Sequence, residues 1–326
     1  SVLIHSDSLY ADEQKKLRLA APLALSGIAA EHSESIRRGI ELAKADLETQ
    51  GWQVEIAYQD TTDQATRVVS AVQLLLAQGH RLFIGPTWSY MVAAAKPLFE
   101  RSDAVACSPA TSSEVTAGPS PQIFHGVTKH GGKLAALKSW LQSENITTAA
   151  IMVSESGWGA LHKGVFEEAC RQNGTSVVLS KSYSLDAEED LTRTLVGLMG
   201  KSRPQVLLAD LNKGGTAILL RRMTEQNLRI PVVGVEKMRD AYTQGLITAD
   251  SRTPPLSVFE VPLKSSFIEK YKAHYNEAPG NYSDSAYDGV MILAKAVLAT
   301  DGTPMAVRNY LRSNFSYSGL SGDFSF

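Results

Sequence analysis

Small hydroxyl side chains cluster directly after two short apolar segments of the chain. Residues 81–84 are followed by Gly85-Pro-Thr-Trp-Ser89, and residues 104–107 by Ser108-Pro-Ala-Thr-Ser-Ser113. Serine and threonine hydroxyls beside the backbone N–H groups of a helix start make a natural cradle for a carboxylate. The same serines are also common helix caps. Each serine alone fits both interpretations, but two clusters after neighbouring strands favour a binding site.

Signatures of enzymes and of metal sites are absent from the sequence. It contains no G-x-S-x-G, H-E-x-x-H or G-x-G-x-x-G motif. Lys213-Gly-Gly-Thr216 has the wrong order for a phosphate loop and is better interpreted as a strand-to-helix turn. The two cysteines have no zinc-site spacing, and a ligand role for His125 or His130 is improbable. We therefore expect a protein that is not an enzyme and that needs no cofactor or metal.

Length and composition exclude several other classes of protein. The chain has 326 residues, which suggests about two domains. Lysine and arginine total 32 against 34 acidic residues, so no basic excess is available for nucleic acid. Hydrophobic residues make up 44% of the chain, as in ordinary globular proteins. No apolar stretch approaches the ~18 residues that span a bilayer, so we expect no direct membrane insertion.

Short β-type segments alternate with longer helical segments along most of the chain. The first series has strands at 17–22, 54–58, 81–84 and 104–107, with helices at 33–47, 64–77 and 90–100. The second series follows Gly131-Gly132, with strands at 148–153, 176–183, 205–210 and 231–233 and helices at 133–143, 160–173, 188–199 and 216–226. The fold class is therefore α/β, with two doubly wound, Rossmann-like lobes that each contain a parallel sheet. A β-like run at 256–261 and helices at 265–275, 283–299 and 304–313 complete the chain and must pack on one of these lobes.

In the order of its motifs, the chain resembles the type I periplasmic binding proteins of the leucine/isoleucine/valine-binding kind. The resemblance extends from about Leu17 to Phe326, and each motif is weak alone. The matching segments, in order, are Pro22-Leu-Ala-Leu-Ser-Gly27 with Gly39, Tyr58-Gln-Asp60, Ile84-Gly85, Ser108-Pro-Ala-Thr-Ser112, Gly157-Trp-Gly159, Gly234-Val-Glu236, Tyr287-Asp288 and Gly319-Leu-Ser-Gly-Asp-Phe324.

The resemblance implies roles for particular residues. Ser89 and the backbone around it would bind the α-carboxylate of a ligand, and Ala110 and Thr111 would contact both the carboxylate and the ammonium group. Glu236 would pair with the ammonium group. The combination is coherent, because a zwitterion needs hydrogen-bond donors at one end and a fixed anion at the other.

Several departures from the family pattern bear on the ligand. His32 stands where the branched-chain receptors have a tyrosine, and Trp158 replaces the usual aromatic residue of the second lobe. Asn212 or Lys213 replaces a tyrosine that lines the family pocket, and Trp88 adds bulk beside Ser89. These changes argue against a simple leucine pocket and leave open an amino acid with another side chain, an aromatic acid or an amide.

The family's three-strand hinge implies a division of the chain that is not sequential. Lobe 1 would comprise 17–127 and 262–316, and lobe 2 would comprise 128–255 and 317–326. Crossings between the lobes would lie near 124–128, 256–262 and 317–324, and residues 1–16 would form an N-terminal extension.

The function that the resemblance implies is binding of a small ligand, most simply an amino acid or a similar molecule, with hinge closure around it. The protein would be the substrate-binding component of an ABC transporter, with a membrane permease as its partner. Its location would be periplasmic or otherwise extracytoplasmic, with the signal peptide outside this chain. The alternative is the ligand-sensing domain of a receptor or regulator with the same fold, for an amide, an aromatic acid or another small polar ligand.

Overall fold

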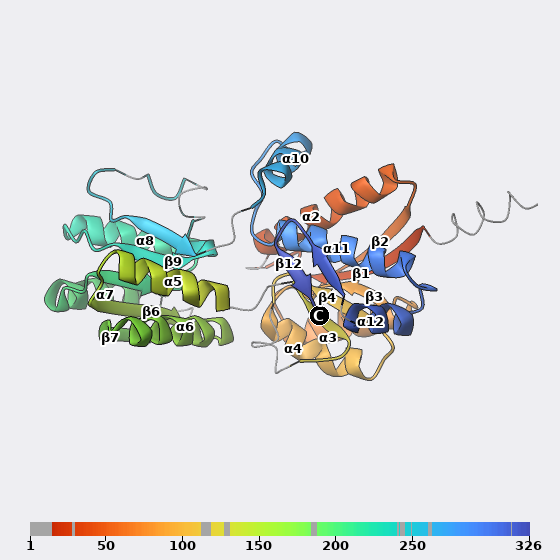
Figure 1. Cartoon of the computed structure of the whole chain (residues 1–326), viewed down its shortest axis with the longest axis horizontal. Helices are drawn as coiled ribbons and strands as arrows, with labels where there is room; N and C mark the ends of the chain where they lie inside the picture. Colours follow the sequence, from red (N-terminus) through yellow and green to blue (C-terminus); the bar gives the residue numbers. More distant parts are fainter. Residues whose placement is uncertain are drawn as a thin grey trace, which may run out of the picture. The chain divides into compact units, whose positions relative to one another are not determined.

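The computed structural model describes residues 15–27, 30–111, 119–126, 131–183, 188–239, 241, 245–248, 250–259, 263–313 and 315–326. The chain divides into two compact units. Unit 1 comprises Ser1–Thr128 and Val261–Phe326, and unit 2 comprises Lys129–Glu260. Each unit contains its own parallel sheet covered by helices (Figure 1).

The sheet of unit 1 has five parallel strands in the order β2-β1-β3-β4-β5. These strands are β1 (Lys16–Leu23), β2 (Gln53–Asp60), β3 (Leu82–Ile84), β4 (Val105–Ser108) and β5 (Ile123–His125). The helices of this unit are α2 (Ala30–Thr49), α3 (Ala65–Ala77), α4 (Ser89–Glu100), α10 (Ser265–Tyr275), α11 (Ser283–Leu298) and α12 (Pro304–Arg312). A hairpin of β11 (Ser316–Ser318) and β12 (Asp323–Ser325) ends the chain.

Both faces of this sheet are buried, each in its own hydrophobic core. Along β1, Leu19 packs in a core with residues of α2, α10, α11 and α12, whereas Ala20 packs in a core with residues of α3 and α4. Alternation of side chains between the two faces explains why the strands are apolar throughout. Helices α2 and α11 approach closely at Gly39, where an added Cβ would lie 2.0 Å from the carbonyl oxygen of Ser283.

Unit 2 repeats the architecture with a sheet ordered β10-β9-β8-β6-β7, also parallel throughout. Its strands are β6 (Thr148–Ser154), β7 (Ser176–Tyr183), β8 (Val206–Ala209), β9 (Val232–Val235) and β10 (Leu256–Phe259). Its helices are α5 (Gly131–Ser143), α6 (Gly157–Asn173), α7 (Glu188–Ser202), α8 (Lys213–Glu225) and the short 3-10 helix η3 (Glu236–Arg239). The predicted fold class is thereby confirmed.

The strand order places a switch point in each sheet. In unit 1 the chain moves from β1 outward to β2 and then returns to the other side of β1 as β3; in unit 2 it does the same with β6, β7 and β8. Loops leave the two strands at such a point in opposite directions, and the carboxyl edge there is where open α/β sheets bind ligands. The loops after β1 and β3, and after β6 and β8, therefore border the edge where a sheet of this kind binds ligands.

The C-terminal segment differs from the sequence prediction. Residues 317–326 belong to unit 1, not to the second lobe, and residues 256–259 form strand β10 of the unit 2 sheet, just before the chain passes to unit 1 after Glu260. Asp288 of α11 is fully buried and accepts hydrogen bonds from the N–H groups of Leu320 (2.9 Å) and Ser321 (2.7 Å) and from the Ser321 hydroxyl (2.6 Å). Phe324 is buried in the unit 1 core. These contacts hold the hairpin on unit 1.

Among the helices of the described residues, none combines the length and the apolar character that a membrane span requires. The same residues contain no group of three His, Cys, Asp or Glu side chains placed to hold a metal ion.

Candidate functional site

Ser89 lies at the start of α4, on the loop that follows β3. The N-cap position belongs to Trp88, which makes no side-chain cap hydrogen bond, so Ser89 is the first helical residue and not the cap. Ser89 is only 7% exposed, and its hydroxyl oxygen has no hydrogen-bond partner within the described part of the chain. A buried hydroxyl without a partner costs about 1–3 kcal/mol. The first N–H groups of a helix also lack partners within the helix and carry partial positive charge. Ser89 and the α4 terminus therefore provide unused donors for an anion.

Hydrogen bonds of other hydroxyl groups, those of Ser33 and Thr87, hold the loops around Ser89 in place. The hydroxyls of Ser33 on α2 and Thr87 on the β3–α4 loop lie 3.0 Å apart, and both residues are fully buried. The N–H of Ala24, just after β1, donates to the Thr87 hydroxyl over 3.5 Å. Three segments that meet at the switch point are thus joined at one place. Among the described residues, the hydroxyl of Thr62, after β2, is the one other buried hydroxyl that has no hydrogen-bond partner.

The turn after β4 contains Ala110 and Thr111, which are 5% and 0% exposed. The Thr111 hydroxyl donates to the Ser108 hydroxyl (2.8 Å) and also lies 2.9 Å from Nδ1 of His125. The Ser108 hydroxyl in turn donates to the carbonyl of Pro86 (3.0 Å) on the β3–α4 loop. Thr111 is therefore bound tightly inside unit 1. Ser112 and Ser113 lie outside the described residues.

Aromatic rings surround the same edge of unit 1. The His32 ring packs at 6.5 Å, edge to face, against Trp88 and at 5.8 Å against Tyr282, and Trp88 packs at 5.8 Å against Tyr90. All four rings are partly exposed or exposed. Tyr282 has a left-handed backbone (φ 64°), which is a genuine outlier for a bulky residue. The structure thus brings His32 and Trp88 to Ser89 and adds Tyr90 and Tyr282, which have no motif that would reveal them in the sequence.

Unit 2 places Trp158 in the first turn of α6, directly after β6. The N-cap hydroxyl of Ser156 accepts a hydrogen bond from the N–H of Gly159 (3.0 Å). Trp158 is partly exposed, and its ring lies 5.7 Å from that of His162, one turn further along. Nδ1 of His162 is 2.9 Å from Oδ2 of Asp210, which follows β8, and these residues are 4% and 0% exposed. The pair links α6, the helix after β6, to the residue that follows β8.

The remaining predicted site residues of unit 2 lie on the loops after β8 and β9. Asn212 is exposed and caps α8, because its side-chain oxygen accepts a hydrogen bond from the N–H of Gly215 (2.8 Å). Lys213 begins α8, and Glu236 begins η3 after β9, but the side chains of both lie outside what the structure describes. The interpretation of Lys213-Gly-Gly-Thr216 as a strand-to-helix turn agrees with this cap.

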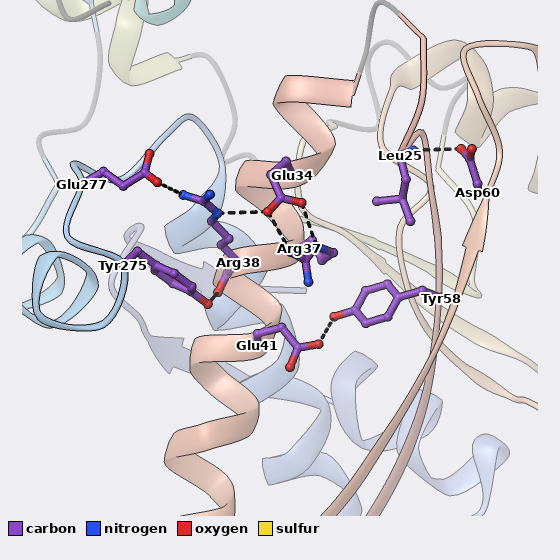
Figure 2. Close-up of polar contacts among 9 residues, drawn as sticks. All are labelled: Leu25, Glu34, Arg37, Arg38, Glu41, Tyr58, Asp60, Tyr275 and Glu277. Atoms are coloured by element: carbon purple, nitrogen blue, oxygen red, sulfur yellow. Dashed lines mark hydrogen bonds and ion pairs between the residues drawn. The ribbon is translucent and has the colours of Figure 1, made fainter.

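Asp60 explains one of the sequence landmarks. Its carboxylate accepts hydrogen bonds from the N–H groups of Leu25 (3.0 Å), Ser26 (3.2 Å) and Thr62 (2.8 Å) and from the Ser26 hydroxyl (2.6 Å). Burial raises the pKa of Asp60, but the hydrogen bonds outweigh burial and lower it below its ordinary value. Figure 2 shows the contact between Leu25 and Asp60. Asp60 therefore shapes the loop after β1.

The outer face of α2 carries polar contacts of a structural kind, also drawn in Figure 2. Glu34 pairs with Arg37 and Arg38 on its own helix, and Arg38 reaches Glu277 beyond α10. The Tyr275 hydroxyl donates to the backbone carbonyl of Arg38 (2.9 Å). These contacts hold α10 on α2 and do not involve the edge that contains Ser89.

Comparison with known proteins decides the family. Residues 16–326 match the family model described as periplasmic binding protein. The chain belongs to this family. No curated protein matches its sequence. The solute-binding protein of an ABC transporter from Rhodopseudomonas palustris BisB5, solved with 3,4-dihydroxybenzoic acid, is 17% identical, with TM-score 0.80 over 95% of this chain and 88% of that one. The branched-chain amino acid binding protein LivJ from Streptococcus pneumoniae, solved with isoleucine, is 17% identical, with TM-score 0.79 over 96% and 92%.

These likenesses confirm the predicted fold, that of the type I periplasmic binding proteins of the leucine/isoleucine/valine-binding kind. As a member of a family of solute-binding proteins, this periplasmic binding protein binds a small molecule and is not an enzyme.

Proposed function

We propose that this protein is the substrate-binding component of an ABC transporter and that it binds an amino acid or an amino-acid-like carboxylate outside the cytoplasm. Its partner would be the membrane permease of that transporter. The single observation that carries the proposal is the buried, partnerless hydroxyl of Ser89 at the start of α4. Free donors at a helix start, on the loop after β3 at a switch point, match the needs of a carboxylate.

In unit 1, the ligand carboxylate would accept hydrogen bonds from the Ser89 hydroxyl and from N–H groups of the first turn of α4. The backbone at Ala110 and Thr111, on the neighbouring strand end, would supply further polar contacts. His32 and Trp88, whose rings pack together beside Ser89, would bound the ligand laterally. Each charge-assisted hydrogen bond of this kind contributes about 1.5–3 kcal/mol.

Unit 2 would complete the site by closing over the ligand. Glu236 would pair with an ammonium group, and Trp158, Asn212 and Lys213 would contact the rest of the molecule. Hinge closure around a small ligand is a recurrent mechanism in periplasmic binding proteins. The ligand stabilises the closed state only in proportion to its differential affinity for the closed over the open state.

The chemistry of the rings in unit 1 favours a second ligand class, an aromatic carboxylate. The rings of His32, Trp88, Tyr90 and Tyr282, each at least partly exposed, form a connected group that includes the residues on both sides of Ser89. Two proteins of similar fold were solved with isoleucine and with 3,4-dihydroxybenzoic acid, which share a carboxylate and differ in the remainder. Both ligand classes use the same Ser89 contact and differ in whether they need the anion of Glu236.

A thermal-shift panel of amino acids and aromatic acids tests the function. A ligand present at one hundred times its dissociation constant stabilises a protein by about 2.7 kcal/mol. Ser89→Ala should weaken the binding of every active ligand about tenfold or more, yet leave the unliganded protein as stable or more stable, because it removes a buried partnerless hydroxyl. Ser70→Ala, on the exposed side of α3, is the matched control and should change neither quantity. Equal affinities of the Ser89→Ala variant and the wild type would contradict the carboxylate assignment.

Glu236→Gln separates the two ligand classes. It should weaken an amino acid strongly, because the ammonium loses its counter-charge, and leave an aromatic acid without an amine nearly unchanged. Loss of both to the same extent would remove Glu236 from the assigned role.

A further inference from the structure

We propose that His125 is a positioning residue of the ligand site: its Nδ1–H group starts a one-way chain of hydrogen bonds that runs through Thr111 and Ser108 to the carbonyl of Pro86 and so fixes the loop that presents Ser89. This inference rests on the proposed function, because Ser89 is taken as the ligand contact. It goes beyond that function by giving a role to a histidine that is not one of the proposed ligand contacts.

The direction of the chain follows from the chemistry of its members. The Pro86 carbonyl can only accept, so the hydrogen of the Ser108 hydroxyl is used in that bond (3.0 Å). Ser108 must then accept from Thr111, whose own hydrogen is used in turn (2.8 Å). The Thr111 oxygen therefore accepts from Nδ1 of His125 (2.9 Å), which must carry a hydrogen. Each step leaves only one assignment, and the last fixes the tautomer of the imidazole.

The chain connects three neighbouring strand ends. His125 is the last residue of β5, Ser108 is the last residue of β4, and Pro86 lies three residues before Ser89 on the loop after β3. Hydrogen bonds in such a row polarise one another and are strengthened by burial, and Ser108 and Thr111 are both 0% exposed. The Ser285 hydroxyl on α11 donates to the carbonyl of Pro109 (2.9 Å) and holds the middle of the row from the other side.

The surroundings of His125 favour the neutral ring that this arrangement needs. Burial is the main cause that lowers the pKa of His125, to about 4, and the positive charge of Lys96 acts in the same direction. A neutral imidazole has one N–H group, and the Thr111 oxygen places it on Nδ1.

One consequence concerns ligand recognition. The hydrogen of the Thr111 hydroxyl points to Ser108 and is not available to a carboxylate, although the family resemblance would have Thr111 contact that group. Within the described loops after β3 and β4, Ser89 is then the hydroxyl that remains free to donate. The bond from His125 thus gives the Thr111 hydroxyl a structural role and leaves ligand binding to the Ser89 hydroxyl.

The first test measures the tautomer directly in the wild-type chain. Long-range ¹H–¹⁵N correlation spectra of ¹⁵N-histidine-labelled protein near pH 7, with His125→Asn to assign the signals, should show a protonated Nδ1 and an unprotonated Nε2 for His125. A ring protonated on Nε2 alone would overturn the proposal, and this readout needs no ligand.

The second test uses substitutions that differ only in where they place an N–H donor. The amide of His125→Asn can occupy the position of Nδ1, whereas that of His125→Gln reaches the position of Nε2. Amide hydrogen exchange in residues 85–92 should be about tenfold faster in His125→Gln, since tenfold corresponds to about one lost hydrogen bond, and within about twofold of wild type in His125→Asn. Helix α8 of unit 2 is the internal control and should not change. Equal exchange in the two variants would mean that His125 fills space and does not act as a donor.

The two proposals fail in distinguishable ways. If no ligand in the panel binds but the tautomer and exchange results hold, the proposed function is wrong and the positioning chain stands. If ligands bind and Ser89→Ala weakens them while both histidine variants exchange alike, the function stands and the positioning role falls.

Discussion

The environment of His125 predicts how the stability of the protein depends on pH. In the unfolded chain a histidine titrates near pH 6.5, whereas burial and Lys96 lower the pKa of His125 in the folded protein to about 4. Between these values the unfolded chain binds the proton more readily, so stability rises with pH. The stabilisation is fully present above pH 6.5 and is lost as pH falls toward 4.

The magnitude follows from the two pKa values. At pH 5 the unfolded histidine is almost fully protonated and the folded one is about nine-tenths neutral, so the linkage amounts to about 2 kcal/mol relative to pH 7. A variant that replaces His125 by a residue that does not titrate should lose this component only. His125→Asn is suitable, because its amide can keep the donor to Thr111.

The assay is urea-induced unfolding at pH 7 and at pH 5, followed by the tryptophan fluorescence of the protein. The drop in unfolding free energy between the two pH values should be about 2 kcal/mol smaller in His125→Asn than in wild type. Asp288, whose pKa is raised mainly by burial, acts in the opposite sense at lower pH, but it is common to both proteins and cancels in the comparison. His274→Asn, at an exposed position on α10, is the matched control for the substitution itself. A drop of the same size in His125→Asn and in wild type would refute the burial of a neutral imidazole at this position.

Two pairs of substitutions test helix packing in the two units and the attachment of the C-terminal hairpin to unit 1. Gly39→Ala should destabilise the protein by about 1–3 kcal/mol, because its Cβ would lie 2.0 Å from the Ser283 carbonyl oxygen. Gly164→Ala, on α6 with nothing within 4 Å, should stabilise it by about 0.5–1 kcal/mol, and thermal unfolding of both variants checks the sign. Asp288→Asn should lower the melting temperature by about 4–10 °C, since an amide cannot accept all three bonds from the hairpin, whereas Asp323→Asn, exposed on β12, should have almost no effect. Equal effects of the two Asp→Asn changes would show that the hairpin is held by its apolar residues instead.

The alternation of apolar segments was sufficient to predict both sheets, because parallel strands covered on both sides leave a strong pattern. Strand β5 has three residues and no measurable period, so its role as the edge of the unit 1 sheet was missed and Phe124 was placed in a crossing. The C-terminal hairpin was assigned to the wrong unit for a different reason. Its position depends on Asp288, about thirty residues earlier, and a contact between a side chain and a distant backbone leaves no periodic signal.

In the candidate site too, positions next to a strand end could be predicted from the sequence, whereas contacts between distant segments could not. Ser89 and Trp88 follow a strand end, and their place at the carboxyl edge could be inferred from the order of elements alone. His32 reaches them because α2 begins beside the same switch point. His125 and His162 were dismissed or passed over, since a lone histidine has no spacing that distinguishes a buried partner from a surface residue. Their partners, Thr111 and Asp210, are known only once the strands are placed side by side.

The hydroxyl groups at the edge of unit 1 illustrate how one residue type divides between structure and function. Ser33 and Thr87 are joined to each other by a hydrogen bond, and the hydrogens of Thr111 and Ser108 are used in the chain that begins at His125. A hydroxyl with both its hydrogen and its neighbours fixed stabilises a loop, but it has nothing to offer a ligand. Ser89 differs because it begins α4 without capping it and keeps an unused, buried donor. Burial of an unmatched polar group is unfavourable for folding, and its persistence is understandable where a ligand supplies the missing acceptor. The distinction between satisfied and unsatisfied hydroxyls, more than the number of serines and threonines, therefore locates the binding position in this unit.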